Sequence, residues 1–297
     1  MCEALVSRAA NPDMLFITGD LGFMALEGLQ AVMGPRFING GVAEQNMMSV
    51  SAALARQKFE VWAYSIAPFC YARPFEQIRN DIAFHKLPVN LIGNGGGYGY
   101  GVMGPTHHAI EDYGVLLTLP DFAVFVPVFD EDVGAVVAAA AGVDRPTYLR
   151  LGRGEHPTGY VPPSYAPWRQ LTVGDGATVL AVGPLAGSYI EAFEALPASR
   201  RPNLWAVAQL PVTANPPPNE LLAQIASASV LCIAEEHVAQ GSFAAQLALY
   251  LATRGLAIPK LTTLHARAHL YERYGSQRFL REQSKLDVPS MLAAIAQ

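Results

Sequence analysis

Short runs of apolar residues alternate with longer amphipathic runs along most of the chain. The short apolar runs predict buried strands at residues 14–18, 59–65, 89–93, 122–128, 147–152, 178–182, 204–207, 230–234 and 261–264. The longer runs have helical periodicity and predict helices at residues 43–57, 71–86, 131–143, 187–196, 219–226 and 242–254. Because strands and helices alternate, we expect an α/β fold with mostly parallel sheets flanked by helices.

This alternation is interrupted at residues 158–173. The segment TGYVPPSYAPWRQLTV contains three prolines and few periodic apolar residues. Proline-rich stretches without hydrophobic periodicity are typical of connections between domains. We therefore expect two consecutive α/β domains, at residues 1–157 and 174–297, joined by a linker over residues 158–173.

The composition favours a globular protein and argues against several other classes. Hydrophobic residues make up 51% of the 297 and charged residues 15%, as in a globular protein. The formal net charge is −5 and Lys and Arg form no cluster, which argues against nucleic acid or an acidic membrane as a partner. No apolar run approaches the ~20 residues that span a bilayer, and the opening MCEALVSRAA lacks the apolar core of a signal peptide. The three cysteines are scattered, so we expect a reduced, cytoplasmic protein without a disulfide framework.

The chain contains a pattern that resembles a cofactor-binding motif, but the elements predicted around it are in the wrong order for that motif. Gly174-Asp175-Gly176 is followed, after 26 residues, by Asn203. This spacing resembles the motif with which thiamine-diphosphate enzymes bind Mg²⁺ through Asp and Asn oxygens. That motif has a strand before it and a helix after it, whereas here a strand pattern, TVLAVG, follows directly. We therefore interpret it as an ordinary Asp-Gly turn.

A stronger functional signal is Glu44, which opens a predicted helix in the string GVAEQNMMSVSAALA. A single Glu in a first helical turn is explained by the helix dipole alone. The whole string, however, closely resembles the start of the pyrimidine-binding domain of the transketolase family. The resemblance continues in the family's order through GDL, ARPFEQIRN, GPTHH and RLGR, and then through IAEEH, GS and YGS in the second domain. It covers nearly the whole chain and implies a pyrimidine-binding domain followed by a transketolase C-terminal-like domain.

The resemblance implies a set of residues for the cofactor thiamine diphosphate. In the family, the glutamate that matches Glu44 hydrogen-bonds the aminopyrimidine ring and so promotes loss of the cofactor's C2 proton, which makes Glu44 both catalytic and cofactor-binding. Phe69 best matches the aromatic residue that stacks on the pyrimidine; the alternative is that it is an ordinary core residue. Ile66 and Asp20 are also expected to contact the cofactor.

The sequence does not decide the role of two arginines in the ARPFEQIRN segment. Both lie in a predicted helix, where charged residues three or four positions apart interact. Arg73 and Arg79 could therefore pair with Glu76 or Asp81 on one helix face instead of serving a site.

The resemblance also implies substrate-binding residues. In transketolases, the histidine that matches His107 of GPTHH contacts substrate oxygens and can move protons near neutral pH. Arg153 matches an arginine that binds phosphate or carboxylate; without the resemblance it could form a surface ion pair. Residues 95–104 form a very Gly-rich loop that we expect to be flexible or to approach a ligand closely, with Tyr98 and Tyr100 shaping the substrate end of the pocket.

Three positions depart from the family's pattern for sugar phosphates. Met103 stands where relatives have an Asp that binds a sugar hydroxyl, and Met24 stands where they have a phosphate-contacting Ser. Cys2 lies nearest to the position of a phosphate-binding Arg. Thioether side chains accept hydrogen bonds weakly. These differences favour a modified, unphosphorylated or nucleotide-linked sugar, with Met103 at the substrate end of the site.

The resemblance finally implies a partner. In this family the cofactor lies between the pyrimidine-binding domain and a separate domain that binds the diphosphate and Mg²⁺. The chain starts where the family's second half starts, so we expect the C-terminal subunit of a split enzyme. It would form a homodimer within an α₂β₂ assembly with an N-terminal, cofactor- and Mg²⁺-binding subunit.

The expected reaction transfers a two-carbon ketol unit from a ketose to an aldehyde. Three alternatives stay open: a subunit resembling 1-deoxyxylulose-5-phosphate synthase, one resembling the beta subunit of a 2-oxo-acid dehydrogenase, and a non-catalytic partner subunit.

Overall fold

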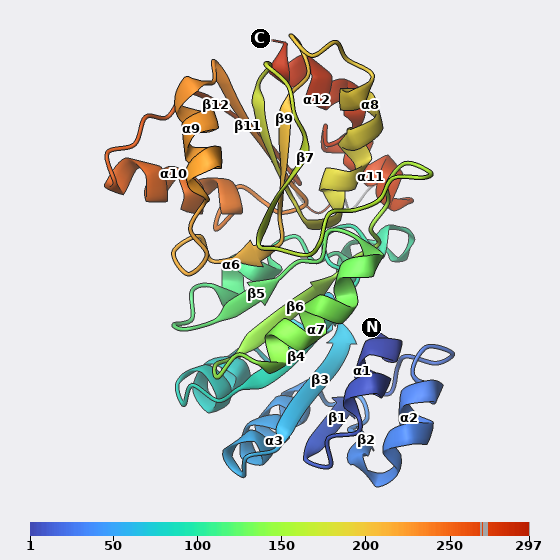
Figure 1. The fold of residues 1–297 in the computed structure, drawn as a ribbon. Helices are drawn as coiled ribbons and strands as arrows, with labels where there is room; N and C mark the ends of the chain where they lie inside the picture. Colours follow the sequence, from blue (N-terminus) through green and yellow to red (C-terminus); the bar gives the residue numbers. More distant parts are fainter. Residues whose placement is uncertain (268, 270–272, 297) are drawn as a thin grey trace.

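The computed structural model describes residues 1–267, 269 and 273–296. The chain forms two β-sheets, each flanked by helices (Figure 1). The first sheet has the strand order β10-β5-β6-β4-β3-β1-β2. Its strands are β1 (Met14–Thr18), β2 (Phe37–Asn39), β3 (Glu60–Ile66), β4 (Val89–Asn94), β5 (Ala123–Phe125), β6 (Thr147–Leu151) and β10 (Gln209–Leu210). Its strand pairs are parallel except the pair of β10 with β5. The expected parallel α/β architecture is thus confirmed.

Both faces of the first sheet are covered, which explains why its strands are apolar without alternation. Phe16 and Trp62 point into a cluster formed with α1 (Cys2–Arg8), α2 (Glu27–Met33) and α7 (Val133–Ala141). Their neighbours Ile17 and Ala63 point to the opposite face. There they pack with α3 (Glu44–Arg56), α4 (Ala67–Tyr71) and α6 (Asp112–Leu116). Strands buried on both faces are typical of parallel sheets.

The second sheet has the order β12-β11-β8-β9-β7. Its strands are β7 (Trp168–Thr172), β8 (Thr178–Val182), β9 (Asn203–Val207), β11 (Val230–Glu235) and β12 (Lys260–His265). One face packs on α9 (Asn219–Ser227) and α10 (Phe243–Thr253), and the other on α8 (Ile190–Glu194) and α12 (Val288–Ile295). A short helix, α11 (Gln277–Gln283), follows β12 along the chain.

Three segments differ from the sequence-based expectation. The end of the expected linker forms β7, which pairs antiparallel with β9. The expected helix over residues 71–86 is instead α4, a short α5 (Phe75–Gln77) and a π-helix over Ile78–Ala83. Pro74 lies between α4 and α5, and proline in a helix interior removes one backbone hydrogen bond. β10, from the second half of the chain, extends the first sheet.

The GDG motif lies where a turn was expected. Asp175 is exposed and lies at a bend directly before β8. The Asn203 side chain hydrogen-bonds both backbone groups of Gly174, at 3.2 and 2.8 Å. Asn203 therefore closes the turn that leads into β8, and the interpretation as ordinary turn chemistry is confirmed.

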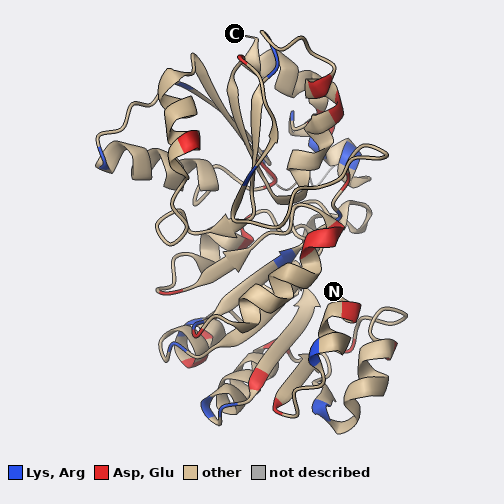
Figure 2. Ribbon diagram, in the orientation of Figure 1, with Lys and Arg blue, Asp and Glu red and all other residues tan. Residues whose placement is uncertain are grey.

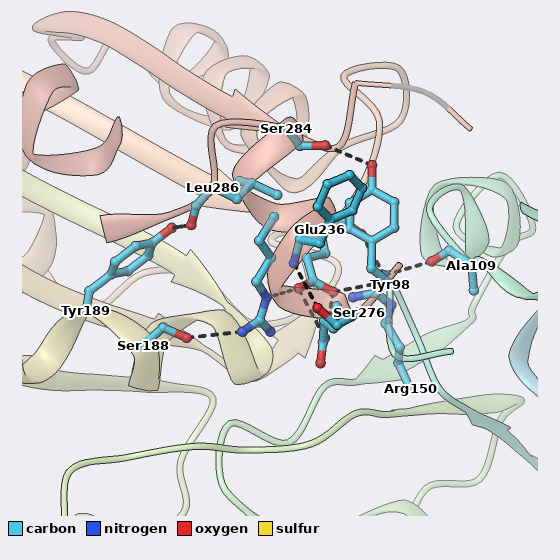
Figure 3. A network of polar contacts seen from close by, with 12 residues as sticks. Tyr98, Ala109, Arg150, Ser188, Tyr189, Glu236, Ser276, Ser284 and Leu286 are labelled. Carbon is cyan, nitrogen blue, oxygen red and sulfur yellow. Dashed lines mark hydrogen bonds and ion pairs between the residues drawn. The ribbon is translucent and has the colours of Figure 1, made fainter. Parts of the chain in front are cut away.

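Part of the Gly-rich loop is packed between the two domains. A Cβ on Gly97 would lie 2.2 Å from Glu236 Oε2, and one on Gly101 would lie 2.4 Å from the carbonyl oxygen of Gly275. Arg150 donates to Asp112 Oδ2 and to the carbonyl oxygens of Ala109 and Glu236. Figure 3 shows this buried network, in which both domains take part. Glycine here serves close packing between domains.

Charge is spread over both domains. Lys and Arg are interspersed with Asp and Glu along the ribbon and do not gather on one element (Figure 2). Among the described residues, no helix combines the length and apolar character needed to cross a bilayer.

Candidate active site

Residues expected at the site converge on one edge of the first sheet. The strands β1, β2, β3, β4 and β6 are parallel, so their carboxyl ends meet at the same edge. Asp20 follows β1, Glu44 follows β2, and Phe69 follows β3. His107 and Arg153 come after β4 and β6. Loops at the carboxyl ends of parallel strands are the usual place for ligand sites in such folds.

Glu44 is the first residue of α3 and is 6% exposed. The chain turns into the helix at Gly41, whose φ of +70° favours glycine. Gly40 lets β2 approach the helix, since a Cβ there would lie 2.8 Å from Met47 Cγ. The carboxylate is hydrogen-bonded by Nη1 of Arg73, at 3.1 and 3.2 Å from its two oxygens. A helix N-terminus favours a carboxylate at this position.

Arg73 connects Glu44 to two aromatic rings. Its guanidinium carbon lies 4.1 Å from the centroid of the Phe69 ring. The Phe69 ring meets the His107 ring edge-on, with centroids 5.1 Å apart. The structure therefore brings Glu44, Phe69 and His107 into one cluster, in which Arg73 links Glu44 to Phe69 and Phe69 contacts His107.

The pairing of Arg73 differs from the helix-face alternative. Asp81 instead accepts a hydrogen bond from Ser49 at 2.6 Å. Arg79 makes no hydrogen bond or ion pair with the part of the chain that the structure describes. A possible signal for Arg73 was its position four residues after Phe69, a spacing that brings side chains together on a helical turn.

The imidazole of His107 has one side-chain hydrogen-bond partner among the described residues. Its Nδ1 lies 2.9 Å from the hydroxyl of Thr106. The centroids of the Tyr100 and His107 rings lie 6.4 Å apart. The Tyr100 hydroxyl accepts a hydrogen bond from Asn94 at 2.7 Å. Thr106 thereby orients the ring and leaves Nε2 as its other proton-exchanging atom. Tyr100 was expected at the substrate end of the pocket, whereas Asn94 is a neighbour of the site that the sequence alone did not single out.

Two other ionisable groups near the cluster stay protonated at neutral pH. Burial, followed by the negative charge of Glu44, raises the pKa of the Cys70 thiol to about 12. Burial also raises the pKa of the Tyr100 phenol, although the hydrogen bond from Asn94 opposes this shift. Neither group is therefore a nucleophile here, because the ionised form is the reactive one.

The remaining predicted residues lie at or after the ends of strands at the same edge of the first sheet. Asp20 is exposed and accepts a hydrogen bond from Asn39 at 3.1 Å. Ile66 ends β3 and is half-buried. Met103 is 52% exposed. Arg153 is exposed and has no hydrogen bond or ion pair with any described residue, so its charge is available to an anion.

Tyr98 lies away from this cluster. It is fully buried, its hydroxyl shares a hydrogen bond with Ser284 at 2.9 Å, and its backbone N–H donates to Glu236 (Figure 3). The pKa of Glu236 lies below its usual value because the Arg281 charge and hydrogen bonds outweigh the effect of burial. Tyr98 therefore joins the two domains, which argues against the substrate contact expected from its place in the loop.

Comparison with known proteins supports the resemblance. Residues 5–158 match the family described as the transketolase pyrimidine-binding domain. A relative from Phocaeicola vulgatus, a subunit of apulose-4-phosphate transketolase, is 31% identical over 151 residues, which are 50% of this chain and 48% of the relative. A 1-deoxy-D-xylulose-5-phosphate synthase from Dechloromonas aromatica is 28% identical over 272 residues, covering 88% of this chain and 41% of that protein. The matched part thus spans half or less of the length of these curated relatives.

A solved structure extends the similarity to the whole chain. It is described as a split-gene transketolase, inactive beta4 tetramer, and aligns with a TM-score of 0.84 and 30% identity. The alignment covers 99% of this chain and 95% of that one. The chain belongs to the transketolase family, and its first domain is the family's pyrimidine-binding domain.

Proposed function

We propose that this chain is the C-terminal subunit of a thiamine-diphosphate-dependent, transketolase-like ketol transferase. The observation that carries the proposal is the cluster of Glu44, Phe69 and His107 at the carboxyl edge of the first sheet. Its residue types and order along the chain agree with the family's cofactor and substrate positions. Free cysteines at all three positions support a cytoplasmic enzyme.

The residues present fit the pyrimidine half of the cofactor. A buried carboxylate and an aromatic face lie close enough for one planar group, the Arg73 guanidinium, to contact both. An aminopyrimidine needs the same two partners, a hydrogen-bond acceptor at its edge and a ring at its face. When bound, thiamine diphosphate supplies the nucleophilic carbon for attack on a carbonyl.

The chain's own residues would orient the cofactor and handle protons. Glu44 would accept a hydrogen bond from the pyrimidine ring nitrogen and hold the proton there. Phe69 would cover the ring and exclude water. His107 would give or take a proton at Nε2 beside the substrate's oxygens, because Thr106 occupies its Nδ1. Ile66 and Asp20 would line the cofactor's side of the site.

The diphosphate and Mg²⁺ would be held by a partner subunit. Among the described residues, no group of three His, Cys, Asp or Glu side chains could hold a metal ion. The similarity to a protein named as one subunit of a transketolase and to one described as a split-gene transketolase supports a two-chain enzyme. We propose an α₂β₂ assembly with an N-terminal subunit that binds thiamine diphosphate and Mg²⁺.

The substrate would be a ketose donor and a sugar aldehyde of non-standard structure. Met103 and Met24, 52% and 84% exposed, offer no useful hydrogen bond to a sugar or a phosphate. Arg153 is exposed and offers a cation without a partner among the described residues. We therefore expect ribose 5-phosphate to be a poor acceptor compared with one whose far end is less charged or bulkier.

A second candidate is a synthase that decarboxylates a 2-oxo acid before the same addition. It is favoured by the similarity to 1-deoxy-D-xylulose-5-phosphate synthase, which covers 88% of the chain. Both reactions would use the same cluster of Glu44, Phe69 and His107.

The test combines this chain with its N-terminal partner, thiamine diphosphate and Mg²⁺. We expect turnover with a ketose plus an aldehyde, and none from the isolated chain. Consumption of pyruvate with release of CO₂ would favour the synthase instead. Ribose 5-phosphate is compared with unphosphorylated and nucleotide-linked aldehydes; if it gives the highest kcat/KM, the expected acceptor preference is wrong. Turnover by the chain alone would contradict the two-subunit enzyme.

A further inference from the structure

We propose that Arg73 is an internal placeholder for the cofactor's aminopyrimidine: its guanidinium occupies the pyrimidine position in the cofactor-free chain and must leave when the cofactor binds. This inference rests on the proposed function, because it assigns the partners of Arg73 to thiamine diphosphate. It concerns a residue that the expected catalytic set, Glu44 and His107, does not include.

The contacts of Arg73 match those that an aminopyrimidine would make. A guanidinium is planar, carries N–H donors at its edge and stacks on aromatic faces. Here Nη1 donates to both oxygens of Glu44, at 3.1 and 3.2 Å, while the guanidinium carbon lies 4.1 Å from the Phe69 ring centroid. The same group thus engages both partners that hold a planar ring. A pyrimidine cannot stack on that face of Phe69 and bond Glu44 while the guanidinium remains in place.

The charge of Arg73 gives a physical reason for a placeholder. Glu44 is 6% exposed, and Arg73 is its hydrogen-bond partner among the described side chains. A buried carboxylate without a partner is costly, because its lost hydration is not replaced. Arg73 therefore stabilises the open site until another N–H donor arrives at Glu44.

Arg73 can also leave its position easily. Its side chain is 49% exposed, whereas that of Glu44 is 7% exposed. It lies in the short stretch between α4 and α5, just before Pro74, so no long helix must move with it. Because the Arg73 half of the pair is exposed, its guanidinium can return to water while a bound ring that donates to Glu44 takes over its contacts. Cofactor binding is then an exchange of one planar donor for another.

The exchange predicts that removing the guanidinium strengthens pyrimidine binding. The probe is 4-amino-5-hydroxymethyl-2-methylpyrimidine, the pyrimidine half of the cofactor, which is uncharged at neutral pH and needs no diphosphate site. Its dissociation constant for the full chain is measured by ligand-observed NMR, without any activity assay. Arg73→Met keeps the length of the side chain and should bind the probe about tenfold more tightly than the wild type.

Three further variants separate the contributions. Arg73→Lys keeps the charge on Glu44 but loses the stacking plane, so its affinity should lie between those of the wild type and Arg73→Met. Arg79→Met removes another arginine of the same segment, one that has no partner among the described residues, and should leave the affinity unchanged. Glu44→Gln should weaken binding in either arginine background.

The outcomes distinguish this inference from the proposed function. If the probe binds, depends on Glu44 and is held less tightly or equally by Arg73→Met, the placeholder is wrong while the pyrimidine site stands. Tighter binding by Arg79→Met to the same extent would also overturn the placeholder, because the effect would then be one of net charge. If no variant binds the probe, and the complex with the N-terminal subunit does not bind thiamine diphosphate, both inferences are wrong.

Discussion

Replacing Arg150 by Met tests whether the buried polar network joins the two domains. Arg150 is 4% exposed, and its Nε lies 2.7 Å from Oδ2 of Asp112, which is fully buried. Its Nη2 donates to the carbonyl oxygens of Ala109 and Glu236, at 2.9 and 2.8 Å. The change to Met keeps the apolar stem but removes all of these donors.

The expected loss of stability follows from the groups that Arg150→Met would leave unpaired. Asp112 would keep one hydrogen bond, from Tyr148 at 2.9 Å, and its Oδ1 already has no partner. Breaking a buried ion pair by removing one partner costs about 3–5 kcal/mol, because it leaves an uncompensated buried charge. The two carbonyl oxygens of Ala109 and Glu236 also lose a hydrogen-bond donor, which lowers the stability further. We therefore expect Arg150→Met to lower the free energy of unfolding by about 3–5 kcal/mol, a large part of a typical total of about 5–15 kcal/mol.

The assay is urea unfolding of the full chain at neutral pH, followed by circular dichroism and by tryptophan fluorescence. Arg278→Met is the matched control, since the Arg278 side chain is 91% exposed and pairs with Glu282 one helical turn away. The control should change the free energy of unfolding by less than about 0.5 kcal/mol. A loss below about 1 kcal/mol for Arg150→Met would refute the reasoning, because solvent or rearrangement would then be compensating Asp112.

Three other changes address the site and its surroundings. Glu44→Gln should abolish turnover of the proposed two-subunit enzyme while the free energy of unfolding changes by less than about 1 kcal/mol; C2–H exchange of bound cofactor at the wild-type rate, followed by NMR, would contradict the assignment. Burial lowers the pKa of His108 below its usual 6.5. The unfolded chain therefore binds the proton first as the pH falls below about 6.5, and stability decreases until the folded protein is also protonated. His108→Gln should flatten part of that slope in urea titrations between about pH 7.5 and 5, and an unchanged slope would exclude His108 as its source. Arg153→Met should raise KM about tenfold for a phosphorylated acceptor but not for its unphosphorylated form; an equal effect on both would show that Arg153 does not bind the phosphate.

Local sequence patterns determined much of the fold and one end of the site. The apolar runs predicted β1 and β8 at the residues where they occur, and the helical pattern after residue 42 predicted α3 to within one residue at each end. Glycine at position 41 and the carboxylate at position 44 are local requirements of a turn that leads into a helix. Such features are visible in a sequence because they depend on residues a few positions apart.

Contacts between distant segments were decided only by the tertiary structure. For Arg73 the sequence left open a partner on its own helix face, but Arg73 pairs with Glu44, 29 residues away. Tyr98 was assigned to a pocket, but its hydroxyl meets Ser284, 186 residues away. Gln209–Leu210 lies in the second half of the chain and pairs with the first sheet. Periodicity reports whether a residue is buried, whereas the partner of a buried polar group depends on how the sheets pack, since each burial must be matched by whichever donor or acceptor the fold brings near.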